Sequence, residues 1–167
     1  MKAHFQYLKY VLKHKLFVFL FCIKNKVPFY RAVLHDLSKF SKTEWAPYAN
    51  NFFNKDGSKR NIRDASGAYN PNSQPEKFKR AWLSHQQNLH HWQAWCSIGD
   101  NGVLSTLEIP ETYIREMLSD WQGAGRAQIG KTWNISDTKK WYDQNKSKMI
   151  LHHNSMKLIE KILTELK

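Results

Sequence analysis

The N-terminal region carries apolar side chains at intervals of three and four residues. From His4 to Lys24 there is no glycine or proline, and this spacing predicts one long helix that contains His14. Its apolar positions are Leu8, Val11, Leu12, Leu16, Leu20 and Ile23. The apolar run at residues 16–23 is shorter than the roughly 20 residues that a membrane-spanning helix needs. We therefore expect this run to be a buried segment of a core helix.

Two shorter helices are predicted next. Pro28 suits the first turn of a helix that runs to the consecutive pair His35-Asp36. Ser41 and Glu44 have the spacing of a capping box, in which the serine closes the start of a third helix and the glutamate reaches back to it. Because Pro47 lacks the N–H that a helix interior uses, a kink or a later start of this helix is expected.

A long polar stretch separates these helices from the next one. Residues 54–74 are rich in Asn, Asp, Ser and Gly and contain four basic residues. This composition is typical of a long exposed loop. Pro75 then opens a helix that carries His85 and continues to Trp95, until a turn-rich patch at residues 99–102 stops it.

The C-terminal third predicts further helices. Their expected starts are Pro110, Ser136 or Asp137, and Asn154 or Ser155. The first of them is expected to end at Gly123, followed by a flexible basic connection that includes Arg126 and Lys131. No segment shows the alternation of a strand. The pattern therefore predicts an all-α, single-domain bundle of about six or seven helices over residues 1–167.

Charge narrows the classes of partner. The net charge is +12, which favours anionic partners such as nucleotides, nucleic acid or an acidic membrane surface, although a solvated basic face is the simpler alternative. The apolar residues are mostly large aromatics at core spacing, so no membrane partner is expected. Cys22 and Cys96 form no CxxC pair and resemble reduced thiols of an intracellular protein. No small-residue cleavage site follows residues 16–23, and a cytoplasmic location is expected.

Histidine and aspartate recur on the predicted helices. Besides His35-Asp36, the candidate ligands are His14, His85, His90, His91 and Asp120. Imidazole and carboxylate suit zinc, iron and manganese, and packed helices build dinuclear sites from inward-facing ligands of this kind. His85 and the pair His90-His91 do not have the spacing of a simple two-histidine helix site, so a bend or loop near Asn88 is expected.

The order His14, His35-Asp36, Asp120 resembles the HD-domain superfamily of metal-dependent phosphohydrolases, and His85 with His90-His91 resembles its two-metal branch. A closer likeness, over nearly the whole chain, is to a family of small uncharacterised phage and bacterial proteins. It rests on the segments His14-Lys15-Leu16-Phe17-Val18, His35-Asp36-Leu37-Ser38-Lys39-Phe40, Ala81-Trp82-Leu83-Ser84-His85, Asn88-Leu89-His90-His91-Trp92 and Glu116-Met117-Leu118-Ser119-Asp120-Trp121.

The resemblance implies a set of ligands for one or two divalent ions, whose identity among Fe, Mn, Zn, Co and Mg stays open. His14, His35, Asp36 and Asp120 would form the core set, and Asp36 would bridge two ions. The ligands of the second ion would be completed by His85 and by one or both of His90 and His91.

Other residues are candidates for binding an anionic substrate. Lys39 lies four residues after His35 and can point to the same side, where it would hold a phosphate or stabilise charge in the transition state. Arg126 and Lys131 are further candidates for phosphate contact, and Trp92 for stacking on a base. Glu44 and Glu116 are expected to orient imidazoles.

The predicted function is a metal-dependent phosphohydrolase that acts on a nucleotide or another small phosphorylated molecule, in the host cytoplasm if the chain comes from a phage. One alternative is a di-iron oxygenase of the HD type, which uses the same order of ligands. Another is a basic protein that binds nucleic acid or inhibits a partner without turnover; its affinity would fall steeply with salt. The oligomeric state stays open.

Overall fold

The computed structural model describes residues 1–68 and 73–166, and the described chain is predominantly helical. Its helices are α1 (Lys2–Lys24), α2 (Phe29–Leu34), α3 (Trp45–Phe52), α4 (Glu76–His85), α5 (Glu111–Ile129), α6 (Ser136–Asn145) and α7 (His153–Glu165). Short 3-10 turns are η1 (Leu37–Phe40), η3 (Trp92–Trp95), η4 (Gly130–Thr132) and η5 (Lys146–Lys148). The predicted helical class and single domain are confirmed. None of the described helices is long and apolar enough to cross a membrane.

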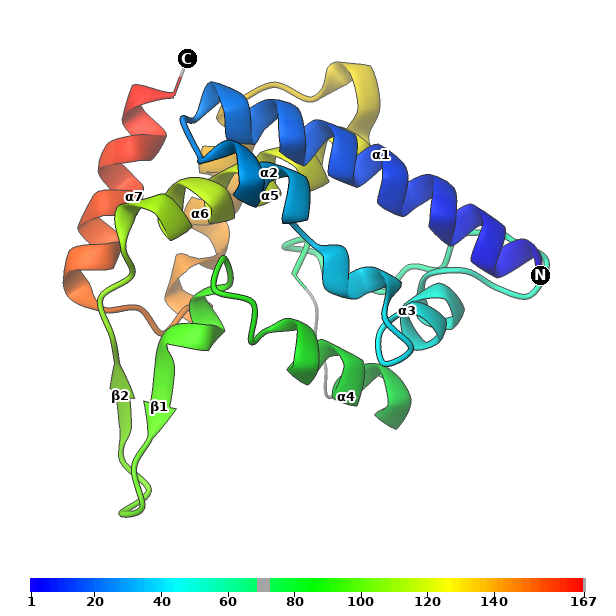
Figure 1. The fold of residues 1–167 in the computed structure, drawn as a ribbon, viewed down its shortest axis with the longest axis horizontal. Helices are drawn as coiled ribbons and strands as arrows, with labels where there is room; N and C mark the ends of the chain where they lie inside the picture. The colour runs from blue at the N-terminus through cyan, green and yellow to red at the C-terminus, as the bar shows by residue number, and fades with distance from the viewer. Residues whose placement is uncertain (69–72, 167) are drawn as a thin grey trace.

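A small hairpin is a feature of regular structure that the hydrophobic pattern missed. Strands β1 (Cys96–Ile98) and β2 (Leu104–Thr106) pair antiparallel, with Cys96 opposite Thr106. They project from the helical body beside α5 (Figure 1). Three-residue strands are too short to show a clear alternation of apolar and polar positions, so this part of the prediction was wrong. The turn-rich patch at residues 99–102 is the tip of the hairpin.

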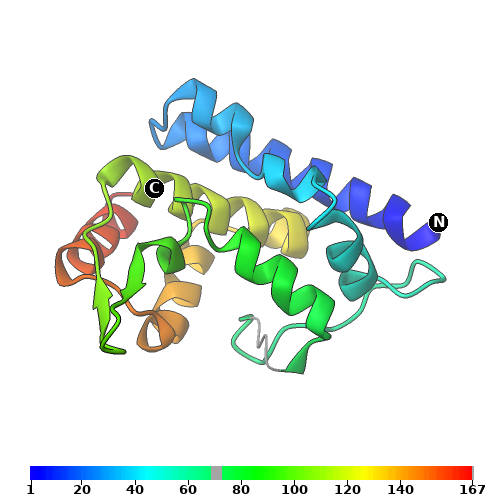
Figure 2. The same cartoon turned by 60° about the horizontal axis from the view of Figure 1, so that its bottom comes forward.

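The long helices α1 and α5 cross at close range, and α1 lies along one side of the molecule (Figures 1 and 2). A Cβ atom on Gly123 would lie 2.4 Å from Cγ2 and 2.8 Å from the backbone N of Val18. Gly123 therefore serves close packing, and the prediction that it ends the helix was wrong. The end comes at Gly130, whose φ of 79° suits a glycine. Arg126 consequently lies on α5 and not in a flexible connection.

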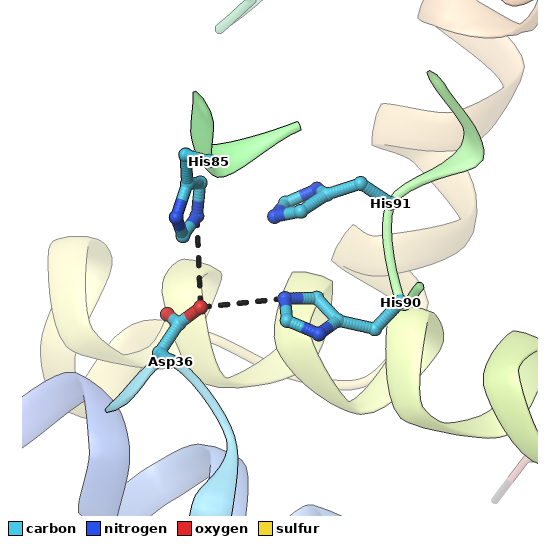
Figure 3. Close-up of side chains that lie close together, drawn as sticks. All are labelled: Asp36, His85, His90 and His91. Carbon is cyan, nitrogen blue, oxygen red and sulfur yellow. Dashed lines mark ion pairs between the residues drawn. The ribbon is translucent and has the colours of Figure 1, made fainter. Parts of the chain in front are cut away.

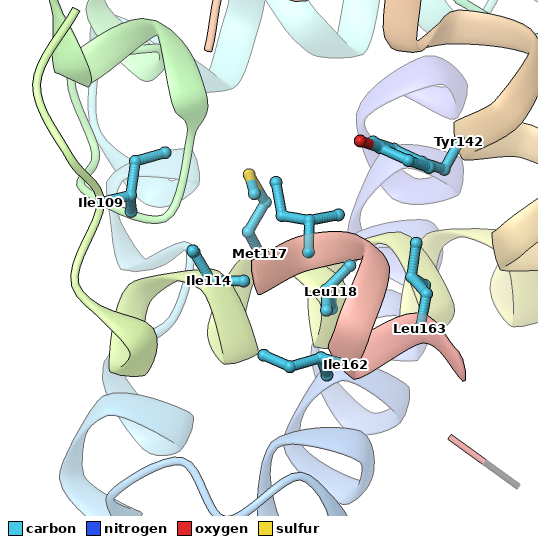
Figure 4. Close-up of a cluster of buried hydrophobic side chains, with 8 residues drawn as sticks. Ile109, Ile114, Met117, Leu118, Tyr142, Ile162 and Leu163 are labelled. Atoms are coloured by element: carbon cyan, nitrogen blue, oxygen red, sulfur yellow. The ribbon is translucent and has the colours of Figure 1, made fainter. Parts of the chain in front are cut away.

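Two apolar clusters flank this crossing. The larger joins α5 to α6 and α7 (Figure 4) and contains Ile109, Ile114, Met117, Leu118, Tyr142, Ile159, Ile162 and Leu163. The other joins α1, α3 and α4 and contains Tyr7, Val11, Tyr48, Ala49, Phe52, Phe78 and Ala81. His14 is buried on the inner face of α1, between Val11 and Val18. His14 thus lies between apolar residues of the core.

The inner face of α1 is not the one that the apolar spacing suggested. Its buried residues are Ala3, Tyr7, Val11, His14, Val18 and Cys22. Leu12, Leu16, Leu20 and Ile23 are 47–56% exposed, so the expected burial of residues 16–23 was wrong for Leu16, Leu20 and Ile23. Because successive helical residues are about 100° apart, a helix that turns His14 inward turns these four side chains towards solvent.

Several helix ends also differ from the predictions. Helix α4 ends at His85 instead of continuing to Trp95, and a turn around Asn88 follows, as expected from the histidine spacing. Helix α3 begins at Trp45, so Pro47 falls in its first turn, where no N–H is missed, and no kink is needed. The N-cap of α7 is His152, not Asn154 or Ser155.

The predicted loop at residues 54–74 is only partly described. The described residues 54–68 contain turns and no helix, and Lys59 forms a bridge with Phe53. Residues 69–72 lie outside the described residues. Ser66 and Asn145 are hydrogen-bonded at 2.8 Å, which ties the loop to the end of α6.

Candidate metal centre

All seven predicted metal ligands converge on one buried site. His14 comes from α1, His35 and Asp36 from the end of α2, His85 from the last residue of α4, His90 and His91 from the following turn, and Asp120 from α5. Asp36 has a left-handed backbone (φ 57°), a conformation that short polar side chains tolerate better than most. This turn directs the carboxylate of Asp36 into the centre of the fold.

The two oxygens of Asp36 face different histidines. Oδ2 lies 2.9 Å from Nε2 of His14 and 3.5 Å from Nε2 of His35. Oδ1 lies 3.5 Å from Nε2 of His85 and 3.3 Å from Nε2 of His90 (Figure 3). Asp36 is therefore placed as a bridge between two groups of potential ligands.

Each group has the composition of a metal site. One contains His14, His35, Asp36 and Asp120, and the other contains Asp36, His85, His90 and His91. Within each group the potential ligand atoms lie within 4.8 Å of one another. Oδ1 of Asp120 closes the first group, at 3.2 Å from Nε2 of His14 and 3.4 Å from Nε2 of His35.

Buried atoms without hydrogen bonds support this interpretation. Nε2 of His35, His90 and His91 and Oδ1 of Asp36 are inaccessible and have no hydrogen-bond partner among the described residues. An unsatisfied buried polar group costs about 1–3 kcal/mol, so four in one place need an explanation. Imidazole nitrogens and a carboxylate oxygen are the donors that divalent transition ions accept. The donor set therefore fits one or two such ions.

Two glutamates hold the far nitrogens of these imidazoles. Oε2 of Glu44 lies 2.9 Å from Nδ1 of His85. Oε1 of Glu116 lies 3.0 Å from Nδ1 of His35 and 3.4 Å from Nδ1 of His90. An Nδ1–H donated to a carboxylate leaves Nε2 as the acceptor and fixes the ring orientation. The predicted proximity of both glutamates to the imidazoles is confirmed.

Glu44 makes this contact instead of completing the capping box. The backbone N–H of Glu44 donates to Oγ of Ser41 at 3.3 Å, which is the serine half of the motif. The carboxylate does not return to Ser41, because it is buried against His85. The predicted capping box was thus right for Ser41 and wrong for the carboxylate of Glu44.

Arg31 is a site residue that the sequence did not reveal. Its Nη2 and Nε lie 2.6 and 2.7 Å from Oε2 of Glu116, so the guanidinium fixes the carboxylate that holds His35 and His90. Glu116 lies 85 positions away from Arg31, and no local pattern marks such a pair. Only the packing of α2 against α5 brings them together.

The electrostatics of the site follow from the closeness of these charges. Burial would raise the pKa of Asp36, but His35 and Lys39 hold it well below its ordinary value. Burial would also raise the pKa of Glu116, yet hydrogen bonds from His35 and His90 lower it to about 2. Burial lowers the pKa of His91 well below its ordinary value. Asp36 is therefore ionised and His91 is neutral, the states in which a carboxylate and an imidazole bind metals.

Lys39 is buried, and its ammonium pairs with Oδ2 of Asp36. Burial would lower the pKa of Lys39, but the charge of Asp36 raises it above its ordinary value. The structure thus places a positive charge beside the carboxylate that faces both ligand groups.

A cavity of about 540 Å³ opens beside the ligands. His91 and Asp120, one from each ligand group, line it. Much of its wall is aromatic and comes from Trp82, Trp92, Trp121, Trp133 and Trp141. Arg63 and Lys148 contribute positive charge. The predicted candidate Trp92 is therefore placed at the cavity.

The other two predicted phosphate contacts do not line this cavity. Nη1 of Arg126 donates to the carbonyl oxygen of Gly130, and the guanidinium lies 5.7 Å from the ring of Phe17. Lys131 is exposed in η4. Because Gly123 does not interrupt α5, the segment that carries both residues is not the mobile basic loop that the sequence suggested.

A second, smaller cavity of about 300 Å³ reaches the ligands from another side. It is lined by His35, Asp36, His90 and Glu116, together with Tyr30. The ligand cluster is thus buried but lies beside two cavities.

Fold and site together define a helical protein with two carboxylate-bridged histidine clusters in its interior. The chain belongs to a family of unknown function, DUF5662, which matches residues 3–165. No curated protein matches the chain, and no solved structure does.

Proposed function

We propose that the protein is a metal-dependent phosphohydrolase of the HD type, which acts on a nucleotide or another small phosphorylated molecule. The observation that carries the proposal is the position of Asp36, whose two oxygens face two different groups of ligands. A carboxylate shared in this way is what a two-ion site requires. One ion would be held by His14, His35, Asp36 and Asp120, and a second by Asp36, His85, His90 and His91.

Divalent ions at such a site make water a nucleophile near neutral pH and neutralise charge on a transferring phosphoryl group. The chain's own residues prepare the site for this. Glu44 and Glu116 hold the imidazoles so that their Nε2 atoms point inward. Lys39 supplies a positive charge next to Asp36, where it would balance an additional anion. The apolar layers around the cluster keep bulk water out, which strengthens these interactions.

The cavity beside the cluster supports a substrate that joins a phosphate to a flat organic group. Its volume lies in the range of about 300–1,000 Å³ typical of small-molecule sites. His91 and Asp120 mark the end where the phosphate would lie, and five tryptophans form much of the remaining wall. Aromatic side chains stack on nucleobases, so a nucleotide is the substrate class that we expect first.

The test begins with metal analysis of protein purified without added metal, followed by measurement of phosphate release from a panel of phosphorylated metabolites. We expect one to two ions per chain and turnover of at least one nucleotide. In Asp36→Asn, which keeps the shape of the side chain and tolerates its left-handed backbone, both metal content and turnover should be lost while the helical circular dichroism remains. Asp143→Asn, the same change at an exposed aspartate of α6 that is not a candidate ligand, is the matched control.

The alternatives give different results. Bound iron with oxygen consumption and no phosphate release would identify an oxygenase. Salt-sensitive binding of nucleic acid by a protein without metal would identify a non-catalytic binder. Wild-type protein that takes up no divalent ion under any condition would overturn the proposal.

A further inference from the structure

The outer face of α1 and α2 is unusually apolar for a surface in contact with water. On α1 the exposed side chains Phe5, Leu12, Leu16, Leu20 and Ile23 follow one another at intervals of three, four or seven residues, so they form one stripe along the helix. Helix α1 has 23 residues and is therefore roughly 35 Å long. An apolar stripe of this length is a sign of an interaction surface.

Helix α2 extends this stripe sideways. It packs along α1, with the rings of Phe19 and Phe29 5.9 Å apart and Nζ of Lys15 3.4 Å from the carbonyl oxygen of Val33. Phe29 is 66% exposed, and Tyr30 is 62% exposed. Val33, Leu34, Leu37 and Phe40 are exposed as well. Figure 2 shows α1 and α2 together along one side of the molecule, across α5 from the β-hairpin.

The charge of this region identifies the kind of partner. Residues 1–35 contain seven Lys and Arg residues and no Asp or Glu. Lys9, Lys24 and Lys26 are exposed beside the apolar stripe, and Nζ of Lys9 lies 4.4 Å from the centre of the Phe5 ring. Lysines next to apolar side chains bury their methylene stems and extend the ammonium to a polar boundary.

From these observations we propose that the α1–α2 face binds the surface of a bilayer that contains anionic lipids. The apolar side chains enter the boundary between headgroups and acyl chains, and the lysines lie among the lipid phosphates. Symmetric pairing with a second copy would bring two faces of the same positive charge together, which is unfavourable. A bilayer instead supplies negative charge and adapts to the convex surface of two helices.

This surface contact differs from a membrane-spanning segment, which the described helices do not provide. The expectation of no membrane partner rested on large aromatic side chains at core spacing, but the structure exposes Phe5, Phe29 and Tyr30 as well as several leucines of α1. The proposal does not depend on the proposed function, because none of the stripe residues is a metal ligand.

The test is flotation of purified protein with vesicles of phosphatidylcholine alone and of phosphatidylcholine and phosphatidylserine in equal parts. We expect binding to the anionic vesicles that weakens with salt, and little binding to the neutral ones. The double variant Leu16→Glu/Leu20→Glu should lower the partition coefficient by more than about tenfold, because it removes two apolar anchors and adds negative charge. Lys9→Glu alone should lower it by at least about fivefold.

Leu83→Glu is the matched control, since Leu83 is exposed on α4, away from the stripe, and it should bind as wild type does. Circular dichroism verifies that every variant is folded. Absence of binding, equal binding to neutral vesicles, or unchanged binding of the double variant and of Lys9→Glu would each overturn the proposal. Self-association in sedimentation velocity that the double variant abolishes would assign the face to a second copy and also overturn it.

Discussion

Glu116 offers the sharpest test of how the candidate metal centre is organised. Its Oε1 is shared between Nδ1 of His35 and Nδ1 of His90, and these histidines belong to different ligand groups. Among the candidate ligands, Glu44 instead pairs with His85, which belongs to the second group. Glu116→Gln and Glu44→Gln are therefore a matched pair of substitutions: both replace a carboxylate by an amide of the same shape, but one acts on two ion sites and the other on one.

The expected magnitude follows from the number of imidazoles that lose their carboxylate. Removal of such an outer partner typically weakens metal binding by about 10–100-fold, which corresponds to about 1.4–2.8 kcal/mol for each ion. Glu44→Gln should weaken the ion held by His85 and leave the other near its wild-type affinity. Glu116→Gln should weaken both. The guanidinium of Arg31, which lies 2.6 Å from Oε2 of Glu116, would also lose its charged partner.

The assay is calorimetric titration of metal-free protein with Mn²⁺ and Zn²⁺, with metal content after desalting as a second measurement. We expect two resolved binding events in wild type, one weakened event in Glu44→Gln and two in Glu116→Gln. Equal effects of the two variants on both events would refute the division into two groups bridged by Asp36. Unchanged binding in Glu116→Gln would refute a role for Glu116 in holding His35 and His90.

Three further predictions concern single residues. Lys39→Met should lower the rate of phosphate release more than it lowers metal affinity, because the ammonium pairs with Asp36 without being a ligand. The test is to measure kcat and, by calorimetric titration, metal affinity for the same variant. An unchanged kcat would remove Lys39 from the reaction. Gly123→Ala should lower the free energy of unfolding by about 1–3 kcal/mol, because the new Cβ would lie 2.4 Å from Val18. Urea denaturation measures this. A denaturation midpoint equal to that of wild type would contradict the close crossing of α1 and α5. The pKa of Glu116 is depressed to about 2 from an ordinary 4.5. It therefore contributes stability that is complete above about pH 4.5 and is lost as the pH falls through about 2. The difference in free energy of unfolding between wild type and Glu116→Gln should shrink over that range, and a constant difference would contradict this.

The sequence was informative about the ligands because their chemistry is carried by residue type and order. His14, His35-Asp36 and Asp120 stand out in a chain of helices as side chains that metals accept, and the structure brings them together with His85 and both His90 and His91. The awkward spacing of His85 and His90 also predicted the turn near Asn88, since a continuous helix would separate them.

The sequence was misleading wherever a local pattern had two physical explanations. Glycine ends helices and also permits close packing, and Gly123 does the second. A serine and a glutamate at capping-box spacing are typical of a helix start. In the structure, however, the carboxylate of Glu44 contacts the imidazole of His85. A leucine at helical spacing is normally a core residue, yet Leu16 and Leu20 are exposed.

By itself, then, the chain's order of apolar, polar and metal-binding residues determined a helical domain and the identity of its candidate ligands, because helix formation and ligand chemistry are local properties. Only the tertiary structure decided that Asp36 faces two ligand groups, that Arg31 supports Glu116, and which side of α1 is buried. These depend on how helices rotate and cross when they pack, and the rotation of α1 is settled by the whole set of its contacts, His14 against Asp36 and Val18 against Gly123 among them.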